Sequence, residues 1–264
     1  MYNDKCQILV ILEQDHGDAD GDGGMMQFLA EEDSLPGVEE AVEFSTLHYD
    51  NLRKVGEGTY GEVFVGASNG EEKVIKVVPF DGALQVNGEA QKRWDDIKTE
   101  ILVAQELTKL RPRLTTSFCE LKECKIVYGS YPQAFLDQWD EFNRAKTSEN
   151  DRPDSFPDDQ KYVVFVFNNC GQDLESFQVK SVAQAKSIVM QVAYALSVAE
   201  RAFEFEHRDL HWGNVLVTDT EEENIHFDLE GQDRVVASHG VRVSIIDFTL
   251  SRLTKGLLVC CFCC

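Results

Sequence analysis

The stretch His207-Arg208-Asp209-Leu210-His211-Trp212-Gly213-Asn214 is followed at once by the apolar residues Val215-Leu216-Val217. The apolar residues predict a short strand, so the polar groups come just before it. A second short segment of strand composition, over 241–246, ends in Ile245-Ile246 and leads directly into Asp247. Carboxylate and amide oxygens are the hard ligands that Mg²⁺ prefers. The two segments therefore indicate chemistry, although each polar side chain taken alone could be an ordinary polar cap.

A glycine-rich segment lies far upstream, at Gly56-Glu57-Gly58-Thr59-Tyr60-Gly61-Glu62-Val63. Because glycine has no side chain, backbone N–H groups in such a segment can approach a triphosphate closely. The pattern alone is weak evidence, since a glycine-rich hairpin can serve turn geometry only. Its weight depends on the residues that follow it.

A lysine follows inside an apolar strand, in Val74-Ile75-Lys76. A cation in such a strand is costly unless it is paired. Glu100 lies three residues after Ile97 on an amphipathic helix predicted over 94–110. We therefore predict a Lys76–Glu100 ion pair that holds the α- and β-phosphates of a nucleotide. In the alternative reading, Lys76 reaches solvent from an edge strand and Glu100 is solvated.

These features occur in the order that is typical of protein kinases. In the kinase pattern Asp209 orients the acceptor hydroxyl and takes up its proton, while Asn214 and Asp247 bind Mg²⁺. The predicted catalytic residues are Asp209, Lys76, Glu100 and His211.

Longer segments resemble one kinase family, haspin, an atypical kinase of mitotic chromosomes. The resemblance is densest in Phe205–Leu216 and in Ser244–Leu253, where Thr249 replaces the glycine that usually follows Asp-Phe. It extends through Tyr128–Pro132, Asn150–Asp154 and Gly171–Glu175. It covers roughly residues 50 to 258, and the combination is highly specific.

The resemblance implies how ATP is held. Phe167 would be the gatekeeper, Asn168–Gly171 the adenine-contacting hinge, and Asp173 the ribose contact. The predicted ATP-binding residues are Gly56, Glu57, Gly58, Thr59, Tyr60, Gly61, Val63, Lys76, Phe167, Asn168, Cys170, Gly171 and Asp173. The hinge departs from the family pattern, because Asn168-Asn169-Cys170 lacks the acidic and aromatic residues expected there.

The resemblance also implies a substrate, the amino-terminal tail of histone H3, phosphorylated on a threonine close to its terminus with ATP and Mg²⁺ as cofactors. Chromatin would be the partner, and the nucleus and chromosomes the location, with the cytoplasm and spindle as further sites. The formal charge of −22 favours a basic partner and argues against nucleic-acid binding. The same charge could simply keep the protein soluble. No run of 18 or more apolar residues occurs, so we expect no membrane binding. We also expect a monomer.

The predicted fold class is α+β, a bilobal protein-kinase-like fold. Residues 1–45 are expected to form an acidic, disordered leader. The small lobe, over 46–168, is expected to be β-rich with one helix and to carry an insertion at 129–160. The large lobe, over 169–264, is expected to be mainly helical. Only 264 − 247 = 17 residues follow Asp247, so this lobe is expected to be truncated.

Local signals place several elements within these lobes. Asn69-Gly70 predicts a hairpin turn between strands at 62–66 and 73–78. The apolar run over 162–167 predicts a further, buried strand. Ser181-x-x-Gln184 predicts the start of a long helix that reaches about Phe203. Residues 219–240 are polar and are expected to form a loop.

The sequence has eight cysteines. Without an export signal, free thiols are expected. Four of them cluster at Cys260, Cys261, Cys263 and Cys264. This cluster could bind metal or be acylated, but no second Cys/His pair lies at zinc-finger spacing, so we predict neither role.

Two other functions fit parts of the sequence. A domain without its carboxy-terminal helices would suit a non-catalytic fragment that binds a nucleotide or chromatin without turnover. The spacing His207-x-Asp209-Leu210-His211-x-Gly213-Asn214 is also similar to that of aminoglycoside and choline phosphotransferases. The phosphate loops of those enzymes usually lack the full Gly-x-Gly-x-x-Gly-x-Val pattern, so a protein kinase is the favoured hypothesis.

Overall fold

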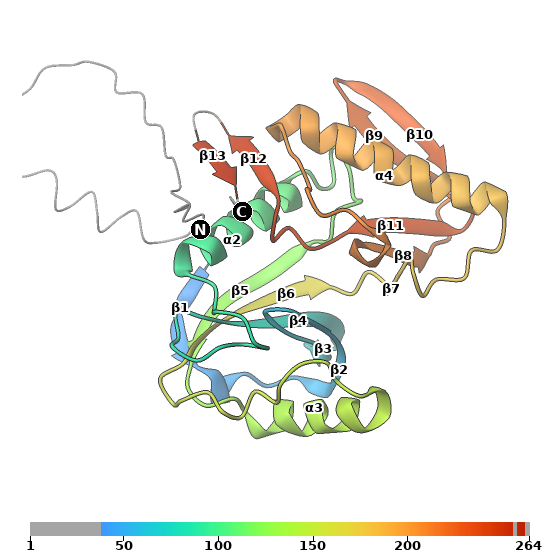
Figure 1. The fold of residues 1–264 in the computed structure, drawn as a ribbon. Coiled ribbons are helices and arrows are strands. Elements are labelled where there is room, and N and C mark those ends of the chain that lie inside the picture. The colour runs from blue at the N-terminus through green and yellow to red at the C-terminus, as the bar shows by residue number, and fades with distance from the viewer. Residues whose placement is uncertain (1–37, 256–257, 262–264) are drawn as a thin grey trace, which may run out of the picture. The chain divides into compact units, whose positions relative to one another are not determined.

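Figure 1 shows the protein as a computed structural model that describes residues 38–255 and 258–261. The chain divides into two compact units. The N-terminal unit contains residues 38–98 and 122–167, and the C-terminal unit contains 99–121, 168–255 and 258–261. Helices and strands are mixed in the chain, which confirms the predicted α+β class.

A six-stranded sheet forms the body of the N-terminal unit, in the order β1-β5-β6-β4-β3-β2. The strands are β1 Val38–Glu43, β2 Asp50–Gly58, β3 Gly61–Ser68, β4 Glu71–Phe80, β5 Leu121–Tyr128 and β6 Lys161–Asn168. β1 pairs with β5 in parallel, whereas β2, β3 and β4 form an antiparallel meander. The three strands predicted in this region are confirmed.

The turn between β3 and β4 is the predicted Asn69-Gly70 hairpin. Both residues have left-handed backbone angles, with φ of 53° and 79°. Ser68 pairs with Glu71 across the turn, so the loop contains two residues. This geometry matches the right-handed twist of the strands, and asparagine and glycine adopt it at little cost.

We predicted a disordered leader over 1–45. This prediction was wrong for residues 38–45, which form regular structure. β1 joins the sheet, and a 3₁₀ helix, η1 Phe44–Thr46, follows it. The ring of Phe44 is fully buried and lies 5.0 Å from the ring of Tyr162. Burial of one such ring stabilises a segment by roughly 2–3 kcal/mol. This gain helps to offset the free-energy cost of ordering an acidic segment. Residues 1–37 of the predicted leader lie outside the described residues.

The predicted insertion contains a helix that we did not predict, α3 Gln133–Lys146. It packs along β2 through Phe135, Leu136 and Trp139, all of which are buried. The ring of Phe135 lies 4.9 Å from that of Phe64 in β3. The spacing of these three apolar residues is helical, so the signal was present in the sequence. The predicted small lobe thus has a second helix.

Two helices confirm predictions, α2 Trp94–Lys109 and α4 Val182–Phe203. The hydroxyl of Ser181 accepts the N–H of Gln184 at 3.1 Å, and the Gln184 side chain accepts the N–H of Lys180 at 2.8 Å. This reciprocal cap fixes the start of α4. By length and composition α4 could span a membrane, but it packs on strands of its own unit, as the core helix of a globular domain does.

Most of the other elements of the C-terminal unit are strands. A three-stranded sheet has the order β11-β8-β7. Its strands are β7 Gln172–Asp173, β8 Val215–Asp219 and β11 Val241–Ile245. A second pair joins β12 Arg252–Lys255 to β13 Leu258–Cys261. Within the described residues this unit is richer in strands than the mainly helical lobe we predicted.

We predicted a loop over 219–240. This prediction was wrong, because the segment contains a hairpin of β9 Asn224–Leu229 and β10 Gln232–Ala237. Its two-residue turn, Glu230-Gly231, has φ of 57° and 75°. Ile225 and Phe227 point to one side of the hairpin and are buried, and Phe227 stacks on Tyr194 of α4 at 5.6 Å. The high polarity of the segment concealed this alternation.

Residues 99–121 belong to the C-terminal unit, whereas we assigned them to the small lobe. The reason is a set of backbone contacts after α2. Cys119 donates its N–H to the carbonyl of Ile245 at 3.0 Å, and Ile245 donates to Ser117 at 2.8 Å. The segment thus runs along the end of β11.

Candidate active site

Asn214 joins the segment over 207–214 to the segment that leads into Asp247. It ends a 3₁₀ turn, η2 Trp212–Asn214, and is 7% exposed. Its amide nitrogen donates to the backbone carbonyl of Asp209 at 3.0 Å. The backbone carbonyl of Asn214 accepts the N–H of Ile246 at 3.0 Å, and Ile246 directly precedes Asp247. Three predicted residues, Asp209, Asn214 and Asp247, therefore come from segments that are bonded to one another within one unit.

His211 contacts Asn214 and caps the same turn. Its Nδ1 accepts the N–H of Gly213 at 3.1 Å, and its Nε2 lies 3.1 Å from the amide nitrogen of Asn214. A Cβ atom at position 213 would lie 2.9 Å from the imidazole, so glycine fits there. His211 thus lies in contact with Asn214, and the catalytic role that we predicted for it stays a prediction.

His207 is a buried connection between the same segments. Its Nε2 lies 3.0 Å from the carbonyl of Ile246, and its own carbonyl accepts the hydroxyl of Ser251 at 3.1 Å. Burial lowers the pKa of His207 below its usual value, although the bond to Ile246 and nearby carboxylates act in the opposite direction. A neutral imidazole that donates to the Ile246 carbonyl fits this environment.

Aromatic rings pack around His207. Its ring lies 6.0 Å from that of Phe248 and 6.2 Å from that of Phe205. Phe118 lies against both phenylalanines, at 5.8 Å from Phe205 and 6.2 Å from Phe248. The loop before β8 and the segment after β11 are thus fixed by a shared core as well as by hydrogen bonds.

The residues present fit a magnesium ion that is bound together with a nucleotide. Asp247 adopts a left-handed backbone, with φ of 60°, and its carboxylate accepts the N–H of Thr249 at 3.2 Å. The amide nitrogen of Asn214 donates to Asp209, and its side-chain oxygen is the atom that would bind a cation. Mg²⁺ usually takes one or two protein oxygens and completes its shell with phosphates and water. Within the described part of the chain, no cluster of three or more His, Cys, Asp or Glu side chains suited to a metal occurs.

The predicted phosphate-covering turn lies in the N-terminal unit, between β2 and β3. Gly58 pairs with Gly61 across it. A Cβ at Gly61 would lie 2.1 Å from the carbonyl oxygen of Val77, so only glycine is tolerated there. Gly56 pairs with Val63, and Val63 pairs in turn with Lys76 on β4. The sheet therefore places the turn and the lysine on neighbouring strands.

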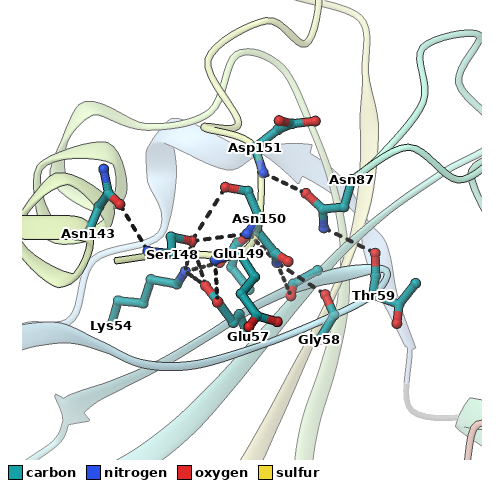
Figure 2. A network of polar contacts seen from close by, with 12 residues as sticks. Lys54, Glu57, Gly58, Thr59, Asn87, Asn143, Ser148, Glu149, Asn150 and Asp151 are labelled. Atoms are coloured by element: carbon teal, nitrogen blue, oxygen red, sulfur yellow. Dashed lines mark hydrogen bonds and ion pairs between the residues drawn. The ribbon is translucent and has the colours of Figure 1, made fainter. Parts of the chain in front are cut away.

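Figure 2 shows that the segment after α3 holds this turn through polar contacts. Asn150 donates to the carbonyl of Gly58 at 3.1 Å and to the carboxylate of Glu62 at 2.8 Å. Asn87 donates to the carbonyl of Thr59 at 3.0 Å and accepts the N–H of Asp151 at 2.9 Å. Neither Asn87 nor Asn150 is among the predicted site residues, because no local pattern marks contacts between residues so distant in the chain.

Glu57 binds the same segment from the other side (Figure 2). Its carboxylate accepts the Ser148 hydroxyl at 2.6 Å and the N–H of Glu149 at 2.8 Å. It also pairs with Lys54, whose side chain is fully buried and whose ammonium lies 4.3 Å from the Phe142 ring centroid. Burial alone would raise the pKa of Glu57, but these bonds lower it overall. We predicted that Glu57 contacts the nucleotide, and the structure shows that its carboxylate is engaged within the protein.

The other predicted residues of the N-terminal unit lie along β4 and β6. Lys76 is partly exposed between buried Ile75 and Val77, and its ammonium lies 5.9 Å from the ring centroid of Phe165. Phe167 stacks on Phe165 at 5.9 Å. Glu100 lies on α2 in the other unit and is buried. The ion pair between Lys76 and Glu100 stays a prediction.

The predicted hinge is anchored within the C-terminal unit. Asn168 donates its N–H to the carbonyl of Glu120 at 3.1 Å and its amide to the Glu120 carboxylate at 2.8 Å. Gly171 has φ of 91°, and a Cβ there would lie 2.3 Å from the Val217 carbonyl oxygen. Asp173 pairs with Leu216 on β8 and accepts the N–H of Ser176 at 2.8 Å.

These features together define the class of protein kinases. Residues 27–263 match the family model described as haspin like kinase domain. The chain is 43% identical over 213 residues to a serine/threonine-protein kinase haspin homolog of Arabidopsis thaliana, covering 78% of this chain and 35% of that protein. It is 41% identical over 223 residues to serine/threonine-protein kinase haspin of Mus musculus, covering 82% of this chain and 30% of that protein. The chain belongs to the haspin-like kinase family.

The chain spans about a third of the length of these relatives. A more distant match, 32% identical over 246 residues, is to the haspin homolog hrk1 of Schizosaccharomyces pombe and covers 86% of this chain and 47% of that protein. Membership of this family implies a serine/threonine kinase domain that uses ATP, generally with a divalent metal.

Proposed function

We propose that this chain is an ATP- and Mg²⁺-dependent serine/threonine protein kinase that phosphorylates a threonine near the amino terminus of histone H3. The observation that carries the proposal is the bonded arrangement of Asp209, Asn214 and the segment leading into Asp247. Asp209 is exposed in the loop that bonds to Asn214, and Asn214 and Asp247 carry the oxygens suited to a metal. Because histone H3 is part of chromatin, we also propose chromatin as the partner and the nucleus as the location.

Each residue would have a defined task. Asp209 would orient the acceptor hydroxyl and take up its proton. Asn214 and Asp247 would hold Mg²⁺, which neutralises charge on the transferred phosphoryl group when it is bound. In the other unit, Lys76 would contact the phosphates, and backbone N–H groups of the glycine-rich turn would cover them.

The charge of the chain supports a basic substrate. Its formal net charge is −22, so long-range attraction would speed encounter with a lysine- and arginine-rich tail. The charge favours the class of substrate, and the family resemblance favours histone H3 within that class.

The proposal is tested with the full chain, labelled ATP, Mg²⁺ and a histone H3 tail peptide. We expect transfer to the peptide, and a loss of roughly 10²–10⁴-fold in Asp209→Asn. A second peptide, in which the threonine near the amino terminus is replaced by alanine, tests whether that threonine is the acceptor. Transfer no greater than that of Asp209→Asn would reject kinase activity, and equal transfer to both peptides would reject the proposed acceptor.

A further inference from the structure

Two thiols meet beside the predicted hinge. The sulfur of Cys119 lies 3.3 Å from the sulfur of Cys170, and neither residue is in a disulfide. Both belong to the C-terminal unit. Cys119 lies next to Phe118 and the backbone contacts with Ile245, whereas Cys170 lies between Asn168 and Gly171 in the hinge.

The two thiols differ in accessibility. Cys119 is 3% exposed, and its sulfur also lies 3.5 Å from the carbonyl oxygen of Asn168. Cys170 is partly exposed. A small reagent can therefore reach Cys170 first. The buried sulfur of Cys119 is in contact with the sulfur of Cys170.

The same contacts divide the chemistry between the thiols. The hydrogen bond from Cys119, with help from the Ser244 hydroxyl, lowers the pKa of Cys170 to about 7 against the effect of burial. That bond and burial raise the pKa of Cys119 well above its usual value. A thiolate is the reactive form of cysteine, so Cys170 is suited to attack first and Cys119 to follow.

We propose that Cys170 and Cys119 are an oxidative modification site that hydrogen peroxide converts to an intramolecular disulfide. The Cys170 thiolate attacks one peroxide oxygen, the O–O bond breaks, and the products are a sulfenic acid and, after protonation, water. The Cys119 sulfur then attacks the Cys170 sulfur, the S–O bond breaks, and the oxygen leaves as a second water. Two thiols lose two electrons and two protons, and one peroxide is reduced to two waters. A dithiol reverses the reaction by exchange.

The geometry requires only a small movement. A disulfide has an S–S distance of about 2.05 Å, so the two sulfurs must approach by roughly 1.2 Å. The bond would tie the hinge to the segment that runs along β11. On the proposed function, on which this consequence rests, nucleotide at the hinge and disulfide formation would influence each other reciprocally.

The test treats the reduced full chain with hydrogen peroxide, blocks remaining thiols with N-ethylmaleimide and maps tryptic peptides by mass spectrometry. Cys119 lies in the peptide over 114–122 and Cys170 in the peptide over 162–180. We expect these two peptides to be linked, and the link to disappear with dithiothreitol. Cys119→Ser should abolish it and leave oxidised or blocked Cys170, and Cys119→Ala serves if the serine variant misfolds. Cys124→Ala, which removes a buried thiol from the other unit, should link as the unchanged chain does.

The proposal is overturned if Cys170 remains open to N-ethylmaleimide while other cysteines oxidise, or if Cys170 links equally to cysteines other than Cys119. The same reaction with ATP and Mg²⁺ tests the hinge separately. Cross-linking slowed by about fivefold or more supports nucleotide at the hinge. Cross-linking at an unchanged rate supports the thiol pair and counts against nucleotide binding at Cys170.

Discussion

Asn214 has its amide nitrogen bonded to Asp209 and beside His211, while its backbone accepts from Ile246. A side chain held in this way loses little freedom when a cation binds to its remaining oxygen. The contact between His211 and Asn214 leads us to predict that the imidazole acts on the site through Asn214.

We expect His211→Ala to lower phosphoryl transfer by about 10–100-fold at low Mg²⁺, because residues that orient metal ligands typically have effects of this size. The measurement is transfer against Mg²⁺ concentration, with part of the loss recovered at high Mg²⁺. His226→Ala is the matched control, since it removes only an exposed contact to Asp233. A Mg²⁺ dependence unchanged by His211→Ala would show that the contact to Asn214 has no role.

His207 makes a prediction about pH. Burial holds the pKa of His207 below its ordinary 6.5, so below that pH the unfolded chain takes up a proton that the folded imidazole refuses. The free energy of unfolding should therefore fall as the pH is lowered through 6.5, by at most about 1.4 kcal/mol per pH unit from this residue. Urea unfolding at pH 7.5 and 5.5 measures the effect. His207→Gln should lose part of this dependence, and an identical dependence in the variant would contradict the assignment.

At the scale of elements, the glycine-rich turn depends on the segment that follows α3. Asn150 and Ser148 bond to the turn and to Glu57 in the N-terminal unit (Figure 2). A turn rich in glycine has high conformational entropy when it is free. The segment over 148–151 restricts it before any nucleotide arrives.

We expect Asn150→Ala to raise the KM for ATP several-fold, because the turn loses its bond at Gly58 and must be ordered by the nucleotide instead. A stability loss of about 1–3 kcal/mol should accompany it, since Glu62 loses a partner. Steady-state kinetics and thermal unfolding measure the two effects. Asp137→Ala on α3, which removes an exposed contact to Gln133, should change neither, and an unchanged KM in Asn150→Ala would contradict the role of the tether.

The cap of α4 allows a test of the fold alone. Ser181→Ala should lower the free energy of unfolding by about 1 kcal/mol, because Gln184 loses the acceptor for its N–H. Ser181→Asp should retain most of the stability, since aspartate is an equally good cap. Equal losses in both variants would show that the cap contributes nothing.

Elements with a local signal could be predicted from the sequence. The Asn69-Gly70 turn, the Ser181 cap and the strands beside Asp209 and Asp247 are set by neighbours in the chain. The hairpin over 224–237 was missed because exposed polar residues outnumber buried Ile225 and Phe227. The site shows the same division, since Asp209 and Asn214 stand in a compact motif. Asn150 reaches the glycine-rich turn only through the fold.

At the scale of the whole molecule, the formal charge of −22 predicts a salt effect on substrate use. We expect the KM for a basic tail peptide to rise as salt is increased from about 50 to 300 mM, because screening shortens the range of attraction. A peptide with its lysines and arginines replaced by glutamine should show a higher KM and little salt dependence. Equal salt dependence for both peptides would contradict electrostatic recognition.

On the proposed function, Asn214 and Asp247 hold a metal–nucleotide complex while Asp209 orients the acceptor hydroxyl and takes up its proton. The test measures the affinity of the chain for ATP with Mn²⁺ in place of Mg²⁺. Electron paramagnetic resonance reports the bound Mn²⁺ in the unchanged chain, in Asp209→Asn and in Asp247→Asn. We predict that Asp247→Asn loses the bound Mn²⁺, whereas Asp209→Asn binds the complex nearly as the unchanged chain does, although it fails to transfer phosphate. Bound Mn²⁺ that is unaffected by Asp247→Asn would show that Asp247 does not hold the metal.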